Sequence, residues 1–459
     1  MKTFRRVWCA RTVRDAIEII PEAFYECFAL VALAYWLIAP LLLWWWGESG
    51  GIEITFLEWV NVQVGALAIA LAGLLLAARR ADVGAGWARD RWRDNLPLML
   101  LGAFLVLALI ATLIHPTDAT WTGDQYRRES MLSFASYVGF FFLASQVFDR
   151  SRRRLLLGLL LGLVVVTCVV TFAAVLIDGW AGGDWALPHR VTAYLHQFNH
   201  YGYLLAVGGA LAASGALVAA RGRVRAALLA VFAIILLTLL LNDTLGAYVA
   251  LASGCVGAVV WLAVLRRLTV TRVVALVAVA VIVHLGAETL GVGTFGELGS
   301  LGADVQAVSA GAADAESAGT GRWGLWVITI EQIAASPWFG HGIEGIADLL
   351  PVGFGRPHNE YLQYAVFFGA PALVAYVAAI AAVFVRLVKR GSGVDAITVC
   401  AAVGAATYLV SACFGNTMYY TAPLLFLLLG VVWAGVRVRG AASGATTLEL
   451  RPEVDEYTR

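Results

Sequence analysis

Long uninterrupted apolar runs are the feature that most constrains how this chain folds. Twelve such runs occur, most of them close to the roughly 20 residues that a helix needs to cross a bilayer. Hydrocarbon gives backbone groups no hydrogen-bond partners, so only helices and closed barrels span it, and continuous apolar runs indicate helices. The sequence therefore predicts an all-α integral membrane protein. The predicted spans are residues 27–46, 59–78, 96–114, 131–148, 155–177, 200–220, 226–241, 246–265, 273–290, 362–385, 394–412 and 421–436.

The composition agrees with a membrane protein. Of the 459 residues, 61% are hydrophobic and 14% are charged, whereas a soluble domain has about half and about a quarter. This balance excludes a soluble enzyme, a nucleic-acid binder and a disordered scaffold. The six Cys are scattered through mostly apolar runs without a CxxC pair, so we interpret them as small buried hydrophobes.

The basic residues predict how the chain is oriented in the membrane. With the N-terminus inside, 27 of the 32 Lys and Arg residues fall on the inner side, which satisfies the positive-inside rule at every loop. Both termini are therefore expected in the cytoplasm. The basic N-terminal segment resembles the start of a signal peptide, but the apolar run after it is too long, so we interpret it as a retained anchor.

Five segments follow from this topology. We expect a basic cytoplasmic segment, nine helices, a long outer loop with one or two short surface helices, three further helices and a cytoplasmic tail. Their boundaries are 1–26, 27–290, 291–361, 362–436 and 437–459.

Five Arg residues remain on the predicted outer side, where Arg is unusual. The planar guanidinium suits two-point pairing with phosphate or carboxylate. Arg190, Arg322 and Arg356 lie in the two long outer loops, and we favour them as anion ligands. Arg127 and Arg128 lie beside acidic residues, so local ion pairing is the favoured interpretation, although Arg128 also stays a candidate substrate ligand.

The densest group of polar residues precedes the tenth predicted span. Pro357 suits the first turn of a helix, which would place His358 at a helix N-terminus. The positive end of a helix disfavours imidazolium, so His358 is expected to be a neutral base. Asn359 and Gln363 are four residues apart on one helix face and are candidates to orient a sugar.

A second polar group lies in the outer segment 178–199 and just beyond it. His196 and Asn199 stand among aromatic residues, a combination typical of a carbohydrate or lipid-headgroup site. His196 and His200 are spaced as two ligands on a helix would be, but no carboxylate or Cys lies close by in sequence, so no metal is predicted.

Charges are rare within the predicted spans. His284 and Glu288 lie near the outer end of one span and Asp395 begins another. A coupled transporter is expected to carry buried charges near the bilayer midplane. A twelve-span transporter of an anion or glycolipid therefore stays an alternative, with catalysis at the outer face favoured.

Several short motifs resemble the O-antigen ligase and polymerase superfamily of bacterial membrane glycosyltransferases. The resemblance extends over most of the chain, since the number of spans and the position of the long outer loop also agree. The motifs are His358-Asn359 with Gly369, Arg322 with Trp326, the turn 336–342, the segment Trp121 to Tyr137, and Asn199.

Two positions depart from the family pattern. Ala372 stands where the last Gly of the ligase motif is expected, and Thr244-Leu245-Gly246 replaces a Ser-Arg-Gly turn. The Arg missing at Leu245 is one that would hold donor phosphate. Either Arg190 or Arg356 substitutes for it, or the donor is held differently.

The resemblance implies a reaction and a place for it. A glycan would move from an undecaprenyl-pyrophosphate carrier to a hydroxyl of a glycan, lipid or protein acceptor, at the outer face of a bacterial cytoplasmic membrane. No metal or other cofactor is implied. His358 would act as general base in an inverting transfer, with Arg322 and either Arg190 or Arg356 on the pyrophosphate. Ligase and polymerase activities are both compatible with the sequence.

Overall fold

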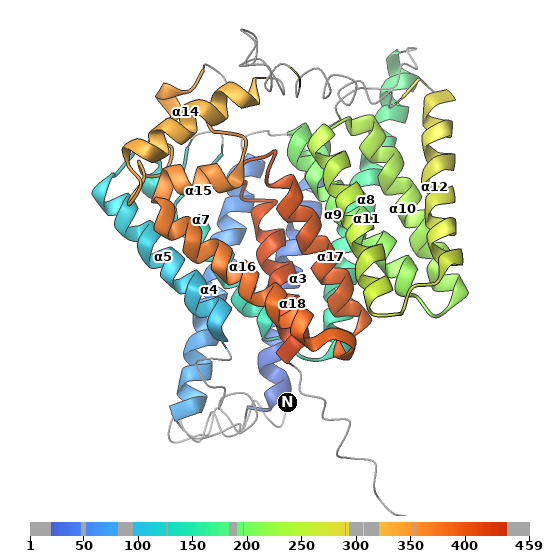
Figure 1. Ribbon diagram of the computed structural model, residues 1–459, viewed down its shortest axis with the longest axis horizontal. Coiled ribbons are helices and arrows are strands. Elements are labelled where there is room, and N and C mark those ends of the chain that lie inside the picture. Colours follow the sequence, from blue (N-terminus) through green and yellow to red (C-terminus); the bar gives the residue numbers. More distant parts are fainter. Residues whose placement is uncertain are drawn as a thin grey trace, which may run out of the picture.

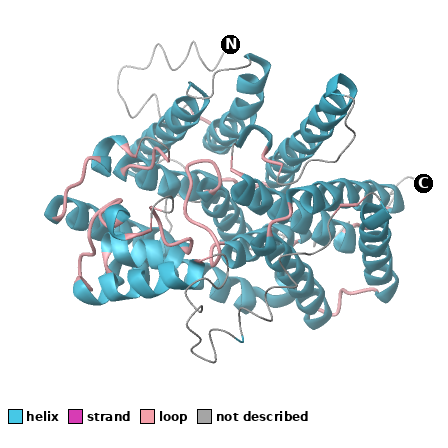
Figure 2. Ribbon diagram, turned by 90° about the horizontal axis from the view of Figure 1, so that it is seen from above, coloured by secondary structure: helices cyan, strands magenta, loops and turns pink. Residues whose placement is uncertain are grey.

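The computed structural model describes residues 20–46, 52–80, 95–124, 127–182, 191–195, 197–289, 291–292, 306, 321–351 and 355–437. Within these ranges the chain is helical and contains no strand, as predicted (Figures 1 and 2). Residues 1–19 of the predicted cytoplasmic segment 1–26 and residues 438–459 of the predicted tail 437–459 lie outside the described residues.

The helices are α3 (Glu22–Trp46), α4 (Ile52–Arg80), α5 (Leu96–Ile114), α6 (Ala119–Thr122), α7 (Met131–Ser145), α8 (Arg150–Gly182), α9 (Phe198–Val218), α10 (Gly222–Asn242), α11 (Leu245–Val264), α12 (Val270–Thr289), α14 (Arg322–Ala335), α15 (Glu360–Phe368), α16 (Ala370–Arg390), α17 (Ala396–Ser411) and α18 (Ala422–Arg437). Short 3-10 helices lie at Ala193–Leu195, Ala347–Leu349 and Gly391–Gly393.

The helices fit a protein that crosses the membrane many times. In the described ranges, nine helices are long and apolar enough to span a bilayer. Three shorter apolar helices, α7, α17 and α18, occupy the predicted spans 131–148, 394–412 and 421–436. The chain is a multi-pass membrane protein, and the total of twelve spans stays a prediction.

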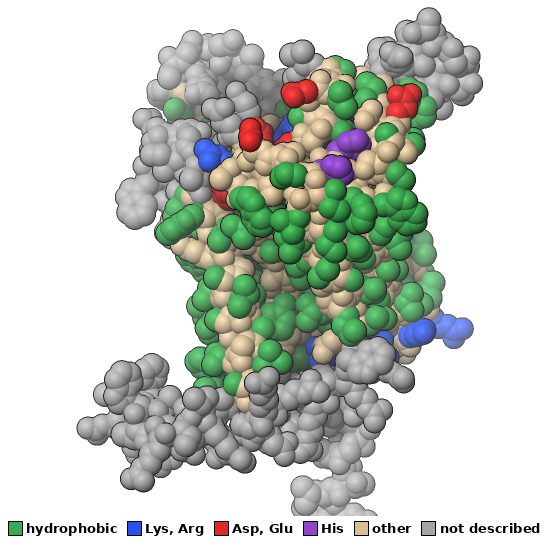
Figure 3. Space-filling view, turned by 90° about the vertical axis from the view of Figure 1, so that its left-hand side faces the viewer, with side chains coloured by type: hydrophobic (Ala, Val, Ile, Leu, Met, Phe, Trp, Pro, Cys, Tyr) green, Lys and Arg blue, Asp and Glu red, His purple; other side chains and the backbone are tan. Residues whose placement is uncertain are grey.

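The surface of the bundle shows how polar and apolar side chains are distributed. On the face in Figure 3, hydrophobic side chains form a band across the middle, and most visible charged and His side chains lie above or below it. At the lower end in Figure 1, Arg153 at the start of α8 donates to Asp395 over 3.0 Å. At the same end, Arg267 donates to the carbonyl of Val394 over 2.8 Å. These basic residues belong to the group predicted to face the cytoplasm.

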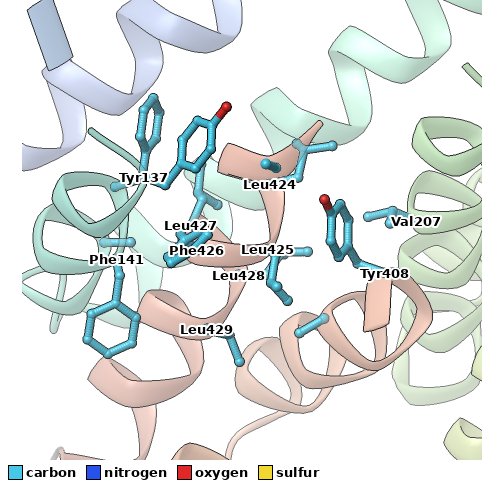
Figure 4. Packing of buried hydrophobic residues seen from close by; sticks show 14 of the residues in the cluster. Tyr137, Phe141, Val207, Tyr408, Leu424, Leu425, Phe426, Leu427, Leu428 and Leu429 are labelled. Carbon is cyan, nitrogen blue, oxygen red and sulfur yellow. The ribbon is translucent and has the colours of Figure 1, made fainter. Parts of the chain in front are cut away.

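The interior is built around α18 and α9. Leu425, Leu427 and Leu428 of α18 are fully buried and pack near Tyr137 of α7 and Tyr408 of α17 (Figure 4). In α9, 89% of the apolar segment is buried, compared with 11% in α12, which lies at the edge of the bundle. Polar residues at the upper end of α9 are therefore inside the protein.

The tenth predicted span differs from the structure. We predicted one helix over 362–385, but α15 and α16 are separate helices joined at Gly369. Gly369 has φ of +85°, and a Cβ there would lie only 2.2 Å from the carbonyl oxygen of Trp338. The prediction was wrong because the Gly-Ala-Pro sequence at this break is as apolar as the helices on either side.

The helical spacing predicted over 322–331 corresponds to α14, which lies across the upper end of the bundle in Figure 1. Leu325 and Thr329 of α14 are buried against the protein. Trp323, Val327 and Ile330 lie on its exposed side. This amphipathic helix covers the end of the bundle where the candidate site lies.

Candidate functional site

Two motifs, the turn 336–342 and the break between α15 and α16, dock onto each other at the end of the bundle that α14 covers. The turn 336–342 reaches the break between α15 and α16, where His341 N–H donates to the carbonyl of Val366 over 2.8 Å. Gly342 N–H donates to Phe367 over 3.0 Å, and Ala370 N–H donates to Pro337 over 2.8 Å. The backbone of the turn therefore fixes α14 against the helix that follows His358.

Arg356 lies at the centre of a buried ionic network. Its side chain is fully buried, Nε donates to Glu344 over 2.6 Å, and Nη1 donates to Glu129 over 2.5 Å. Nη1 also donates to the carbonyl oxygen of Thr417 over 2.9 Å. Burial alone would lower the pKa of Arg356, but Glu344 and Glu129 outweigh it and raise the pKa above its ordinary value.

This placement differs from the predicted role of Arg356 at the pyrophosphate. Both carboxylates already neutralise the guanidinium, and none of its side chain is exposed. Removing one partner from such a buried pair leaves an uncompensated charge, which costs about 3–5 kcal/mol. Through these hydrogen bonds Arg356 joins the segments around Glu129, Glu344 and Thr417, and its contact with the pyrophosphate stays a prediction.

The amides predicted to orient a sugar are engaged within the protein. Asn359 Oδ1 accepts the N–H groups of Tyr361 and Leu362, both over 3.0 Å, so Asn359 caps α15. Gln363 is fully buried, donates to Thr417 Oγ1 over 2.6 Å and accepts Thr417 N–H over 3.0 Å.

His358 precedes this cap. Because Asn359 caps the helix, the prediction that Pro357 occupies its first turn was wrong. His358 has φ of +51°, and its N–H donates to Asn416 Oδ1 over 2.7 Å. Burial, followed by the charges of Arg322, Arg127 and Arg356, lowers the pKa of the half-buried imidazole to about 4. His358 is therefore neutral at physiological pH, mainly because of burial and the neighbouring guanidinium groups.

Arg322 lies close enough to His358 to act on it electrostatically and is the first residue of α14. Its side chain is half-buried, and in the described part of the chain no carboxylate lies within ion-pair distance of it. Arg322 therefore brings positive charge to the neighbourhood of His358 that no described acidic residue pairs with.

The structure also describes three further polar residues, Arg128, Asn199 and His200. Arg128 has φ of +51° and interacts electrostatically with Glu58 of α4. Asn199 is half-buried in the first turn of α9. Next to it, His200 is buried with Nδ1 3.2 Å from Thr421 Oγ1, and its ring packs edge-on against Tyr420.

Two of the predicted site residues are not described by the structure, and two residues of the ionic network were not predicted. Arg190 and His196 lie outside the described residues. In the described ranges, no three His, Cys, Asp or Glu side chains are grouped to hold a metal ion. Glu344 and Thr417 were not predicted, because nothing in their local sequence indicates that they meet Arg356.

Comparison with known proteins agrees with the motifs. The sequence model of the O-antigen ligase family matches residues 228–377, a region that includes Arg322, His358 and Gly369. No curated protein matches the chain. The match agrees with the resemblance found in the sequence and supports a membrane glycosyltransferase of the ligase and polymerase type. The match covers about a third of the chain and supports membership of the O-antigen ligase superfamily.

Proposed function

We propose that the protein transfers a glycan from an undecaprenyl-pyrophosphate carrier to an acceptor hydroxyl, with His358 as general base. The observation that carries this proposal is a neutral imidazole set beside the guanidinium groups of Arg322 and Arg127. Inverting transfer needs a base for the acceptor proton and fixed cations for the negative charge that develops on the leaving group.

The proposed transfer is a single displacement at the anomeric carbon of the donor. A ring nitrogen of His358 takes the proton of the acceptor hydroxyl while the acceptor oxygen bonds to the anomeric carbon of the donor. The bond between that carbon and the phosphate oxygen breaks, and its electron pair leaves with undecaprenyl pyrophosphate. Attack opposite to the leaving group inverts the anomeric centre. We propose that the active site lies at the outer face of the cytoplasmic membrane, as the distribution of basic residues predicts.

Arg322 is proposed to stabilise the pyrophosphate. Its guanidinium is not neutralised by a described carboxylate, so it can pair with phosphate oxygens through two parallel hydrogen bonds. Arg356 is proposed to position His358 from within the ionic network. Asn359 and Gln363 are proposed to hold this segment, since their amides already have partners.

Four residues stay proposed substrate ligands. Arg128 and Asn199 are half-buried and are proposed to contact the glycan or the carrier. Arg190 and His196 keep their predicted roles on the pyrophosphate and the sugar.

The test uses purified protein in lipid nanodiscs with a glycan-loaded carrier and an acceptor. We expect a covalent glycan product that forms equally with and without a metal chelator. His358→Ala should lower the rate by about 10²–10⁴-fold, the usual contribution of a general base. Arg322→Ala should also lower turnover. His115→Ala, a change at an exposed His, is the matched control and should have wild-type activity.

The product distinguishes the alternatives. A single glycan added to a non-repeating acceptor identifies a ligase, whereas a ladder of repeating units identifies a polymerase. Flux of glycolipid without a covalent product would replace the proposal with a transporter. Full activity of His358→Ala would show that His358 is not the general base.

A further inference from the structure

Asn416 lies in the segment between α17 and α18 and contacts the backbone of the proposed base. Its Oδ1 accepts the N–H of His358 over 2.7 Å, and 6% of the residue is exposed. Because a backbone N–H only donates, this hydrogen bond determines which end of the amide faces His358. The Nδ2 group of Asn416, with its two N–H donors, therefore faces away from that backbone.

The Nδ2 group of Asn416 has no acceptor in the part of the chain that the structure describes. The other buried amide side chains differ, since their nitrogens donate to oxygens of the protein: Asn61, Gln146, Asn242 and Gln363. The nitrogen of Asn416 is also not among the partnerless polar atoms that the protein encloses completely. Buried donors are nearly always paired, so an accessible donor without a protein acceptor is available to a ligand.

Further hydrogen bonds fix the segment around Asn416 to the start of α15. Glu360 N–H donates to the carbonyl of Ala412 over 2.8 Å, and Asn359 Nδ2 donates to the carbonyl of Cys413 over 3.2 Å. A donor that is held in place before a ligand arrives loses little conformational freedom on binding. The hydrogen bond that such a donor makes therefore adds more to affinity.

Asn416 also holds His358 in an uncommon backbone conformation. With φ of +51°, His358 lies in the left-handed region, which few residues other than Gly adopt. The hydrogen bond from its N–H to Asn416 Oδ1 stabilises this conformation and with it the direction in which the imidazole leaves the backbone.

We propose that Asn416 positions His358 through Oδ1 and donates from Nδ2 to a hydroxyl oxygen of the substrate. This inference rests on the proposed function, in which His358 takes a proton from a hydroxyl group. A neutral amide suits a hydroxyl oxygen, whereas phosphate pairs more strongly with a guanidinium. The hydroxyl belongs either to the first sugar of the donor or to the acceptor.

The experiment uses the full-length protein in phosphatidylcholine nanodiscs. It measures binding of bare undecaprenyl pyrophosphate, binding of the glycan-loaded carrier extracted from native membranes, and the KM for the acceptor. Asn416→Asp keeps the oxygen that accepts from His358 but loses both donors. We expect it to weaken binding of the loaded carrier, or to raise the acceptor KM, by about 2- to 10-fold, the usual contribution of a neutral hydrogen bond. Binding of the bare carrier should stay at the wild-type value.

The same variants test the positioning of His358. The carboxylate introduced by Asn416→Asp favours imidazolium, so kcat/KM should begin to fall at a higher pH than in wild type. Asn416→Ala loses the hold on the His358 backbone as well, so its kcat at neutral pH should be lower than that of Asn416→Asp. Gln146→Glu is the matched control, because it exchanges a buried amide for a carboxylate beyond the other end of α7 from Glu129. It should keep all wild-type values.

The outcomes decide between the sources of the hydroxyl. A change confined to the loaded carrier assigns it to the donor sugar, and a change confined to KM assigns it to the acceptor. Wild-type values of both in Asn416→Asp would overturn the inference, as would equal weakening of both carriers, which indicates a phosphate contact. The ratio of the two carrier affinities and the KM do not depend on the amount of folded protein, so they decide even if the variant melts early.

Failure of the proposed function has a different signature. Binding of the loaded carrier that depends on Asn416, without transfer by wild type, would overturn only the proposed function. If wild type transfers no glycan and Asn416→Asp binds both carriers normally, both proposals fail.

Discussion

At the scale of single residues, the charges around His358 determine when it can act as a base. Arg322 on α14, Arg127 before α7 and Arg356 beside it act on its imidazole, and His358 itself acts on the imidazole of His200 on α9. Burial and the three Arg residues lower its pKa to about 4, from an ordinary 6.5. Only the neutral imidazole accepts a proton, so kcat/KM should fall as the pH drops through about 4 and stay level up to neutral pH.

The donor should change this value once it is bound. Its pyrophosphate compensates the neighbouring Arg charges, which removes part of the cause of the low pKa. The acid limb of kcat, which reports the complex, should therefore lie at higher pH than the acid limb of kcat/KM. Rates of the purified protein across the pH range check both limbs, with His115→Ala as a control that keeps the wild-type profile. Coincident limbs near 6.5 would contradict a buried imidazole among cations.

Candidate site residues could be predicted where the local sequence groups reactive side chains. The residues that contact them in the folded protein could not be predicted. The segment around His358 stood out because a His and two amides follow an Arg and a Pro. The role of Arg356 could not be predicted, since its partner Glu129 lies 227 residues away. The sequence does not distinguish an Arg that binds phosphate from an Arg that is buried between two carboxylates.

At the scale of elements, Gly369 controls how the catalytic segment is held. Gly369→Ala would force a side chain into positive φ and place its Cβ 2.2 Å from the carbonyl oxygen of Trp338. With ψ of 163°, Gly369 lies in a region that essentially only Gly adopts, so the backbone strain alone costs about 1–3 kcal/mol, and the contact adds to it. We expect a melting temperature lower by several degrees and reduced transfer, because the turn 336–342 can no longer dock on the α15–α16 break.

The matched control is Gly102→Ala in α5. A Cβ at Gly102 has no neighbour within 4 Å, and Ala in a helix is more stable than Gly by about 0.5–1 kcal/mol. This variant should keep its activity and melt at the wild-type temperature or above. Equal melting temperatures and activities for the two variants would show that the break at Gly369 is dispensable.

The helices themselves were predictable because run length is a direct consequence of bilayer thickness. What run length misses is a break made of small apolar residues, as at Gly369, and a helix start that depends on a side-chain cap. Asn359 rather than Pro357 sets the start of α15 through its hydrogen bonds to two backbone N–H groups. Several neighbouring residues in such a segment could cap the helix. A sequence pattern alone therefore predicts the first residue of the helix only to within about one turn.

At the scale of the whole molecule, the basic residues gather as a membrane topology requires. Arg153, Arg267 and Arg390 make their contacts at one end of the bundle. The network of Arg127 and Arg356 is at the other end. The sequence predicted this separation from counts alone, because charge cannot remain in the hydrocarbon and each span must end on one side.

The side that faces the cytoplasm is testable with two exposed positions. Ser392 lies at the basic end and Asp348 lies at the site end, and both are exposed. In a background without native Cys, Asp348→Cys should react with a membrane-impermeant maleimide added to intact spheroplasts. Ser392→Cys should react only after the membrane is permeabilised, because the positive-inside rule places it in the cytoplasm. The reverse pattern would put His358 on the cytoplasmic side, where a donor exposed at the outer face could not reach it.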